Sequence, residues 1–235
     1  MKIIDRETGK REGKNLEKTS SEKIKLNEVD PIIRNAEKGE FNEYSPMDPP
    51  DAYDKDRAIG VNYDDLHVSL QALYDEHKTA VNICADFEKA LNSFKEGGYC
   101  ITKEINDDFN TFFVYFDEEI IPHNKKEEKG LFLALHRRML DSGEHSEGES
   151  PHTPIDLMEQ DHIKLLQLAT LTFNFLGLAM RLKTPESAAV TLDLAYNKGK
   201  ELAELLQLHI YRENNIIFPI AQKILTEEEL NQFYG

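Results

Sequence analysis

The chain has 235 residues, of which 40% are hydrophobic, enough for a sizeable core in one domain or in a domain with an appendage. Its formal net charge of -16 comes from 28 basic and 44 acidic residues. This charge disfavours nucleic acids and anionic membrane surfaces as partners, because both are recruited by patches of Lys and Arg.

The first part of the chain, residues 1–60, is charged and poor in large apolar residues, and it ends in the turn-rich stretch "SPMDPPDAYDKD". This composition predicts a charged N-terminal extension outside the main core. Residues 61–235 are expected to form the main domain.

Two amphipathic helices are predicted over 64–96 and 102–140, the first ending at a Gly-Gly pair and the second interrupted by a kink at Pro122. The residues expected to face the core are Leu66, Leu70, Leu73, His77, Val81, Cys84 and Leu91 in the first helix, and Phe109, Phe112, Phe116, Ile120, His123, Glu127, Leu131 and Ala134 in the second.

Two more helices are predicted over 154–182 and 185–224, each opened by a Thr cap and a Pro at the first helical position. Their expected core residues are Met158, His162, Leu165, Ala169, Phe173 and Leu176, then Leu202, Leu205, His209, Glu213, Ile216 and Ile220. A capping box in "LTEEEL" predicts a short terminal helix. Because no segment shows sustained strand alternation, the sequence predicts an all-α, antiparallel four-helix bundle, an architecture that can hold metal sites between its helices.

The cysteine content and the apolar segments indicate the compartment. Cys84 and Cys100 are too few for a disulfide framework and lack the CxxC spacing of a zinc or redox site. The N-terminus has no apolar secretory stretch, and polar residues interrupt the most apolar segment, 165–180. We expect a cytoplasmic protein that does not contact a membrane.

Each predicted helix carries one histidine on its apolar stripe: His77, His123, His162 and His209. Any one of them could be an ordinary core histidine with a hydrogen bond. Burying all four would be costly unless something takes up their lone pairs, which a metal ion does.

His77 and His123 are 46 positions apart and His162 and His209 are 47 apart, so the helix pairs look like two copies of one hairpin related by a pseudo-twofold axis.

In each copy the second helix carries a Glu four residues after its His, Glu127 and Glu213, which places His and Glu on one helix face. Four imidazoles and two carboxylates suit two adjacent metal ions, each with two imidazoles and bridged by both carboxylates. Imidazole with carboxylate and no thiolate favours iron or manganese, with a non-haem di-iron centre as the first choice.

The order of these residues, with a Phe five positions after each Glu, resembles the hemerythrin-like, or HHE cation-binding, family over about residues 63–225. The resemblance implies that the four histidines are terminal ligands of two iron ions in an oxo-bridged centre and that Glu127 and Glu213 bridge them, with manganese as a possible substitute. Oxygen-carrying members have a further histidine where this chain has Leu166. The similarity is closer to bacterial iron-centre repair proteins of the nitrosative and oxidative stress response.

Three further residues are candidates for a place near the site. Glu119 and Asp161 fall where that repair group has acidic residues, and they could contact the ligands or mark an iron exit path, with solvated surface charges as the alternative. Tyr74, one turn from His77, could line the pocket.

Two functions remain open at this point. The first is a redox or repair protein that reacts with NO, O2 or peroxide or gives iron to iron-sulfur proteins. The second is a module that binds O2, NO or iron reversibly, and a helical protein with unmetallated histidines is a third alternative. The missing further histidine favours reactivity, because fewer nitrogen ligands leave more exchangeable positions on the metals. The pH dependence of these reactions is expected to be modest above neutrality, where the imidazoles are already deprotonated, and metal should be lost as acid competes for the imidazoles.

Overall fold

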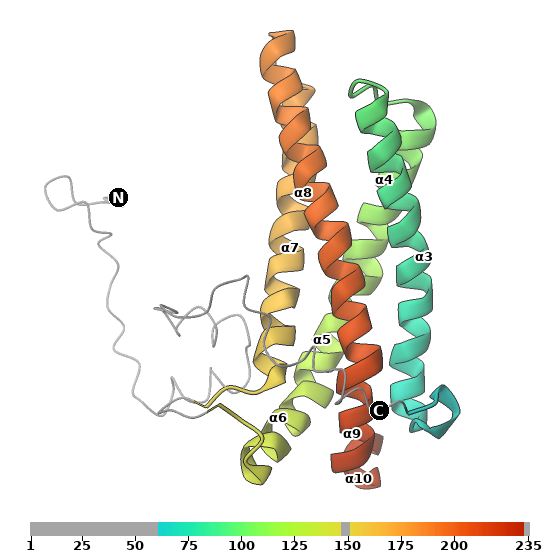
Figure 1. Cartoon of the computed structure of the whole chain (residues 1–235). Coiled ribbons are helices and arrows are strands. Elements are labelled where there is room, and N and C mark those ends of the chain that lie inside the picture. Colours follow the sequence, from blue (N-terminus) through green and yellow to red (C-terminus); the bar gives the residue numbers. More distant parts are fainter. Residues whose placement is uncertain (1–60, 147–150, 233–235) are drawn as a thin grey trace, which may run out of the picture. The chain divides into compact units, whose positions relative to one another are not determined.

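Four helical rods run alternately up and down in the computed structural model, which describes residues 61–146 and 151–232 (Figure 1). The first rod is α3 (Val68–Glu96), and the second joins α4 (Lys103–Tyr115), a π-helical turn (Phe116–Ile120), α5 (Ile121–Lys129) and α6 (Leu131–Ser142). The third is α7 (Pro154–Ala179), and the fourth joins α8 (Pro185–Arg212), a second π-helical turn (Glu213–Ile217) and α9 (Phe218–Ile224). A 3-10 turn (Tyr63–Asp65) precedes the rods and α10 (Glu227–Gln232) follows them.

The described ranges contain no strand, so the predicted all-α, antiparallel four-helix bundle is confirmed. Within the same ranges no helix combines the length and the apolar character that crossing a membrane requires. The predicted N-terminal extension, residues 1–60, lies outside the described residues.

The helix starts follow the local signals in the sequence. Thr102 caps α4 by accepting a backbone N–H, and Thr153 forms a capping box with Asp156 at the start of α7. Thr226 and Glu229 exchange the same reciprocal bonds at α10. These bonds satisfy amide groups that would otherwise lack partners in the first helical turn.

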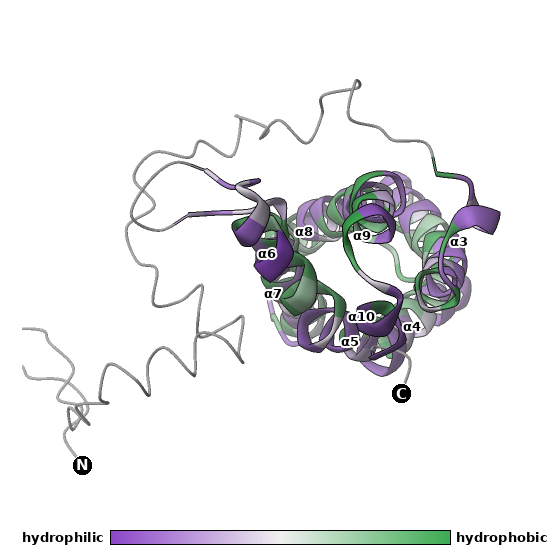
Figure 2. Ribbon diagram, turned by 90° about the horizontal axis from the view of Figure 1, so that it is seen from below, coloured by the Kyte–Doolittle hydropathy of each residue, from purple (hydrophilic) through white to green (hydrophobic). Residues whose placement is uncertain are grey.

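Apolar side chains fill the bundle in two separate clusters, one after the other along its axis. The cluster nearer the α3–α4 connection includes Cys84, Phe87, Phe112, Leu165 and Leu202. The cluster at the other end includes Leu70, Phe132, Met158, Ile217 and Phe218. In the view along the axis, hydrophobic residues face the inside of the ring of helices and hydrophilic residues face outward (Figure 2). Between the two clusters lies a level of buried polar side chains.

Two residues assigned to the apolar stripes are exposed instead, Val81 to 41% and Phe173 to 60%. On α7 the buried position is Thr172. Gly199 of α8 lies so close that a Cβ atom there would come within 3.4 Å of Thr172 and 2.9 Å of Leu91. A large side chain therefore has no room at this helix contact, and Phe173 points away from it.

Thr184 also departs from expectation, because no side-chain hydrogen bond caps α8 there.

The second and fourth rods are interrupted in the same way. Pro122 is the second residue of α5 and Pro219 is the second residue of α9, and each helix directly follows a π-helical turn. Proline lacks an N–H and its ring clashes with the preceding turn, which a widened turn relieves. The predicted interruption at Pro122 thus takes the form of a π turn. A further break at Gly130, which separates α5 from α6, was not predicted.

Candidate metal centre

The level between the two apolar clusters holds all six predicted ligands. They are His77 on α3, His123 and Glu127 on α5, His162 on α7, His209 on α8 and Glu213 at the start of the second π turn. None of the six is more than 8% exposed, and both glutamates are fully buried. The helices therefore bring together residues from all four rods at one point inside the bundle.

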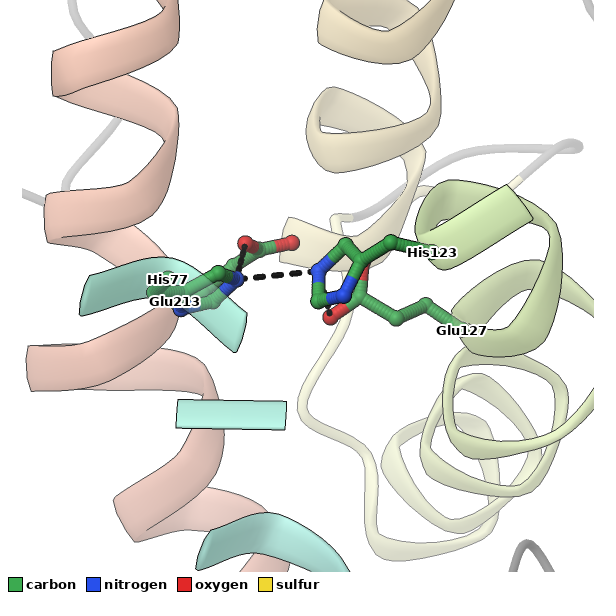
Figure 3. Close-up of side chains that lie close together, drawn as sticks. All are labelled: His77, His123, Glu127 and Glu213. Carbon is green, nitrogen blue, oxygen red and sulfur yellow. Dashed lines mark hydrogen bonds and ion pairs between the residues drawn. The ribbon is translucent and has the colours of Figure 1, made fainter. Parts of the chain in front are cut away.

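Four of these residues form a first subsite (Figure 3). The Nε2 atoms of His77 and His123 lie 2.9 Å apart. Oε2 of Glu213 lies 3.2 Å from Nε2 of His77, and Oε1 of Glu127 lies 3.5 Å from Nε2 of His123.

The second subsite repeats this arrangement with the other two histidines. The Nε2 atoms of His162 and His209 are 3.0 Å apart. Oε1 of Glu213 lies 3.0 Å from Nε2 of His209, and Oε2 of Glu127 lies 3.6 Å from Nε2 of His162.

Each glutamate thus offers one oxygen to each subsite, as a bridging carboxylate does. The ligand atoms of each four-residue group all lie within 4.8 Å of one another, and the two groups share Glu127 and Glu213. Neither oxygen of either carboxylate has a hydrogen-bond partner. Because burying an ionised carboxylate without compensation is very costly, this donor set fits two cations.

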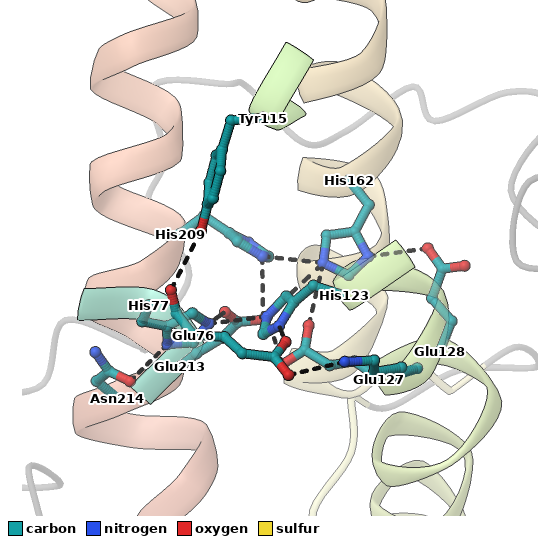
Figure 4. A network of polar contacts seen from close by, with 11 residues as sticks. Glu76, His77, Tyr115, His123, Glu127, Glu128, His162, His209, Glu213 and Asn214 are labelled. Carbon is teal, nitrogen blue, oxygen red and sulfur yellow. Dashed lines mark hydrogen bonds and ion pairs between the residues drawn. The ribbon is translucent and has the colours of Figure 1, made fainter. Parts of the chain in front are cut away.

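The outer ring nitrogens hold the imidazoles in the orientation that a metal would need. Three Nδ1 atoms hydrogen-bond a side-chain oxygen: Asn214 for His77 (2.7 Å), Glu76 for His123 (2.7 Å) and Glu128 for His162 (2.9 Å) (Figure 4). Nδ1 of His209 lies 3.6 Å from the carboxylate of Asp161, too far for a hydrogen bond. Carboxylate and amide oxygens accept hydrogen bonds, so Nδ1 carries the proton and Nε2 directs its lone pair inward. Two lone pairs that meet at about 3 Å require a positive charge between them.

In the metal-free protein a proton supplies this charge. Burial alone would lower the pKa of His123, but the negative charge of Glu127 close to its ring and the hydrogen bond to Glu76 raise it to about 10. Burial acts the same way on the pKa of His209, which Glu213 and Asp161 likewise raise to about 10. Burial would also raise the pKa of Glu213, but the positive His209 beside it holds that pKa well below its usual value. The expectation of modest pH dependence above neutrality concerns the metal-loaded protein, in which metal replaces these protons, and it stays a prediction.

Two aromatic rings complete the pseudo-twofold pattern. Phe132, five residues after Glu127, stacks on His162 with ring centroids 5.5 Å apart. Phe218, five residues after Glu213, stacks on His77 at the same separation. The Phe of the first hairpin therefore packs against a histidine of the second hairpin, and the Phe of the second packs against a histidine of the first. Each stacking contact fixes the ring plane of that histidine.

Two cavities adjoin the centre. The first, of about 330 Å³, is lined by Glu76, Tyr115, Glu119 and His123, among others, and the exposed Glu119 connects it to the surface. The second, of about 370 Å³, is lined by Tyr74, His77, Lys78, Val81, Asn82 and Asn214. Of the residues predicted near the site, Glu119 and Tyr74 thus lie on cavity walls. The carboxylate of Asp161 lies 3.6 Å from Nδ1 of His209 and forms an ion pair with Arg212.

Three ligand partners were not predicted: Glu76, Glu128 and Asn214. Each is next to a ligand in the sequence, yet each contacts a ligand on a different rod. The acid before His77 was visible in the sequence. Its partner could not be inferred, because it depends on how two helices are rotated about their axes.

The fold and this site together define a four-helix-bundle protein with a candidate centre for two cations. The family model of the hemerythrin HHE cation binding domain matches residues 68–221. The chain belongs to this family.

Similar curated proteins include the iron-sulfur cluster repair protein YtfE of Escherichia coli O81 (strain ED1a), 32% identical over 113 residues. The YtfE proteins of Escherichia coli O1:K1 / APEC and Escherichia fergusonii are 31% identical over the same length. Each alignment covers 47% of this chain and 45% of the relative, so the matched segment spans less than half the length of these proteins. No solved structure gives a significant match.

Proposed function

We propose that this protein binds two iron ions between Glu127 and Glu213 and reacts with NO, O2 or peroxide in the protection or repair of iron centres. The observation that carries the proposal is the pair of fully buried carboxylates, each with one oxygen toward each histidine pair and no hydrogen-bond partner. When bound, two adjacent irons supply redox chemistry and exchangeable coordination positions for small molecules.

The protein's own residues orient the ligands and control access. The oxygens of Glu76 and Glu128 hold the Nδ1 protons of His123 and His162, so that the Nε2 lone pairs point inward. The two apolar clusters close the bundle on both sides of the site. The cavity walled by Tyr115 and Glu119 is large enough for diatomic molecules and peroxide.

The absence of a further histidine supports reactivity over reversible oxygen carriage. Leu166 is exposed, and its neighbour Leu165, which faces the core, is fully buried. Neither side chain can act as a metal ligand. We therefore expect both metals to keep open positions.

The names of the similar repair proteins support iron-sulfur proteins as partners. The two cysteines, Cys84 and Cys100, are both free thiols, which suits the reducing cytoplasmic compartment in which such partners occur.

Metal analysis combined with stopped-flow spectroscopy tests the proposal. Protein expressed in iron-replete medium should contain close to two irons per chain. After reduction, mixing with oxygenated buffer should oxidise it irreversibly, and NO should bind in a ratio of up to two per chain. One metal per chain, or zinc alone, would contradict the two-iron site. Recovery of the reduced spectrum under vacuum would instead establish reversible oxygen binding.

A further inference from the structure

The pseudo-twofold relation extends beyond the ligands to the charges around them. Glu76 and Asp161 each precede the lone histidine of one rod, and each contacts the other histidine of the same subsite. Lys126 and Arg212, each three residues after that histidine, pair with these acids at 2.8 and 2.7 Å. At these positions the two subsites have the same charges.

Two positions break the relation. At the first, Glu76 accepts the Nδ1 proton of His123 at 2.7 Å, whereas Asp161 lies 3.6 Å from Nδ1 of His209, beyond hydrogen-bond distance, but both partners are carboxylates and the charge is the same. The second position differs in charge. Glu128 and Asn214 each directly follow a bridging glutamate, and each accepts the Nδ1 proton of a histidine on another rod, at 2.9 and 2.7 Å. Glu128 is a carboxylate, whereas Asn214 is a neutral amide. His162 therefore has a negatively charged partner that His77 lacks.

This difference changes how strongly the two subsites hold a cation. A carboxylate that accepts the Nδ1 proton makes the imidazole a stronger donor at Nε2, and losing such a partner typically costs 10- to 100-fold in metal affinity. His77 lines both cavities and His123 lines the first, so both histidines of this subsite are accessible; of the other pair, His209 lines the first cavity and His162 lines neither. Charge and access thus point to the same subsite as the weaker one.

We propose that the two subsites are unequal, that the metal held by His77 and His123 binds more weakly and exchanges first, and that Asn214 is the positioning residue that sets this order. The inference rests on the proposed two-metal function. It adds which of the two ions leaves first and which side chain determines it.

Anaerobic titration of the metal-free full chain with Co²⁺, followed by its visible absorption, tests the order of binding. Two steps should appear, with affinities about 10- to 100-fold apart. In crystals loaded with one equivalent, the anomalous scattering of Co²⁺ should lie between His162 and His209. Equal affinities, or a first ion between His77 and His123, would overturn the inference.

Single substitutions assign the cause. Asn214→Asp adds a carboxylate without changing the shape of the side chain and should bring the two steps together. Glu128→Gln removes the carboxylate at the related position and should weaken the tighter step about 10- to 100-fold. Asn215→Asp is the matched control, because Asn215 is exposed and its amide bonds only the carbonyl of Tyr211.

The outcomes distinguish the proposed two-metal function from the inequality of the two subsites. If Asn215→Asp shifts the titration as much as Asn214→Asp, the effect is one of general charge and the role of Asn214 is refuted. Far-UV circular dichroism checks folding, and Glu128→Gln decides the matter should Asn214→Asp not fold. Binding of less than one Co²⁺ per chain would refute the proposed function together with this inference, whereas two equally bound ions would refute the inference alone.

Discussion

The two halves of the candidate centre have the same ligands in different surroundings. In the first subsite the supporting pair is largely exposed, with the side chain of Lys126 57% and that of Glu76 40% accessible. In the second the corresponding pair is buried, with Arg212 and Asp161 at 10% and 9%. The two hairpins thus share the ligands and the order of the charges but not their contact with solvent. We interpret the second subsite as an anchor and the first as the accessible side.

Removing a shared ligand should abolish the distinction between the halves, and this is the largest effect expected. Glu127→Ala or Glu213→Ala takes one oxygen from each subsite, so metal content should fall from two per chain to below one. Elemental analysis of the purified variants measures this. His145→Ala is the control, because His145 is exposed and bonds only a neighbouring carbonyl. An equal loss of metal in His145→Ala would show that the ligand assignment is wrong.

Removing an unshared ligand should disable one half and spare the other. His77→Ala and His162→Ala each leave one complete pair of imidazoles, because the pairs are His77 with His123 and His162 with His209. About one metal per chain should remain in each variant, as counted by elemental analysis. Loss of both metals in both variants would mean that neither subsite can be filled alone.

The two supporting ion pairs should differ in their contribution to stability. Arg212→Met leaves the carboxylate of Asp161 buried without this partner, which should cost about 3–5 kcal/mol of unfolding free energy. Lys126→Met removes an exposed partner of Glu76 and should cost less than about 1 kcal/mol. Urea denaturation of the two metal-free variants, each compared with the unsubstituted chain, gives both values. Similar losses would contradict the difference in burial.

The last prediction concerns pH. In the metal-free protein the pKa values of His123 and His209 are raised to about 10 from the usual 6.5, so their protonation stabilises the folded state. This contribution is fully present below pH 6.5 and is lost as pH rises through about 10. The melting temperature of the metal-free protein should therefore fall between pH 7 and 10.

The metal-loaded protein should not show this fall, because the metals have replaced both protons. Thermal melts followed by far-UV circular dichroism compare the two forms. Parallel pH profiles would show that His123 and His209 are not the groups that titrate. A dye-based assay should also detect about two protons released when metal is added near pH 8.

Much of the fold could be predicted from the sequence because its signals are local. Helical spacing of apolar residues located the rods, and Thr153 with Pro154 marked the start of α7 within a residue. Phe173 was wrongly placed in the core, because the buried position on this part of α7 is Thr172, which packs near Gly199 of α8.

The six candidate ligands were also predictable from the sequence alone, because the His-x-x-x-Glu spacing and the 46- and 47-residue repeats depend only on helix geometry and chain order. Only the tertiary structure decided which histidines pair, which oxygen of Glu213 faces which subsite, and that Asn214 rather than an acid supports His77. These contacts join separate rods, so they depend on the rotation and axial shift of one helix against another. Side-chain packing sets both across the whole bundle, and no short stretch of sequence records them.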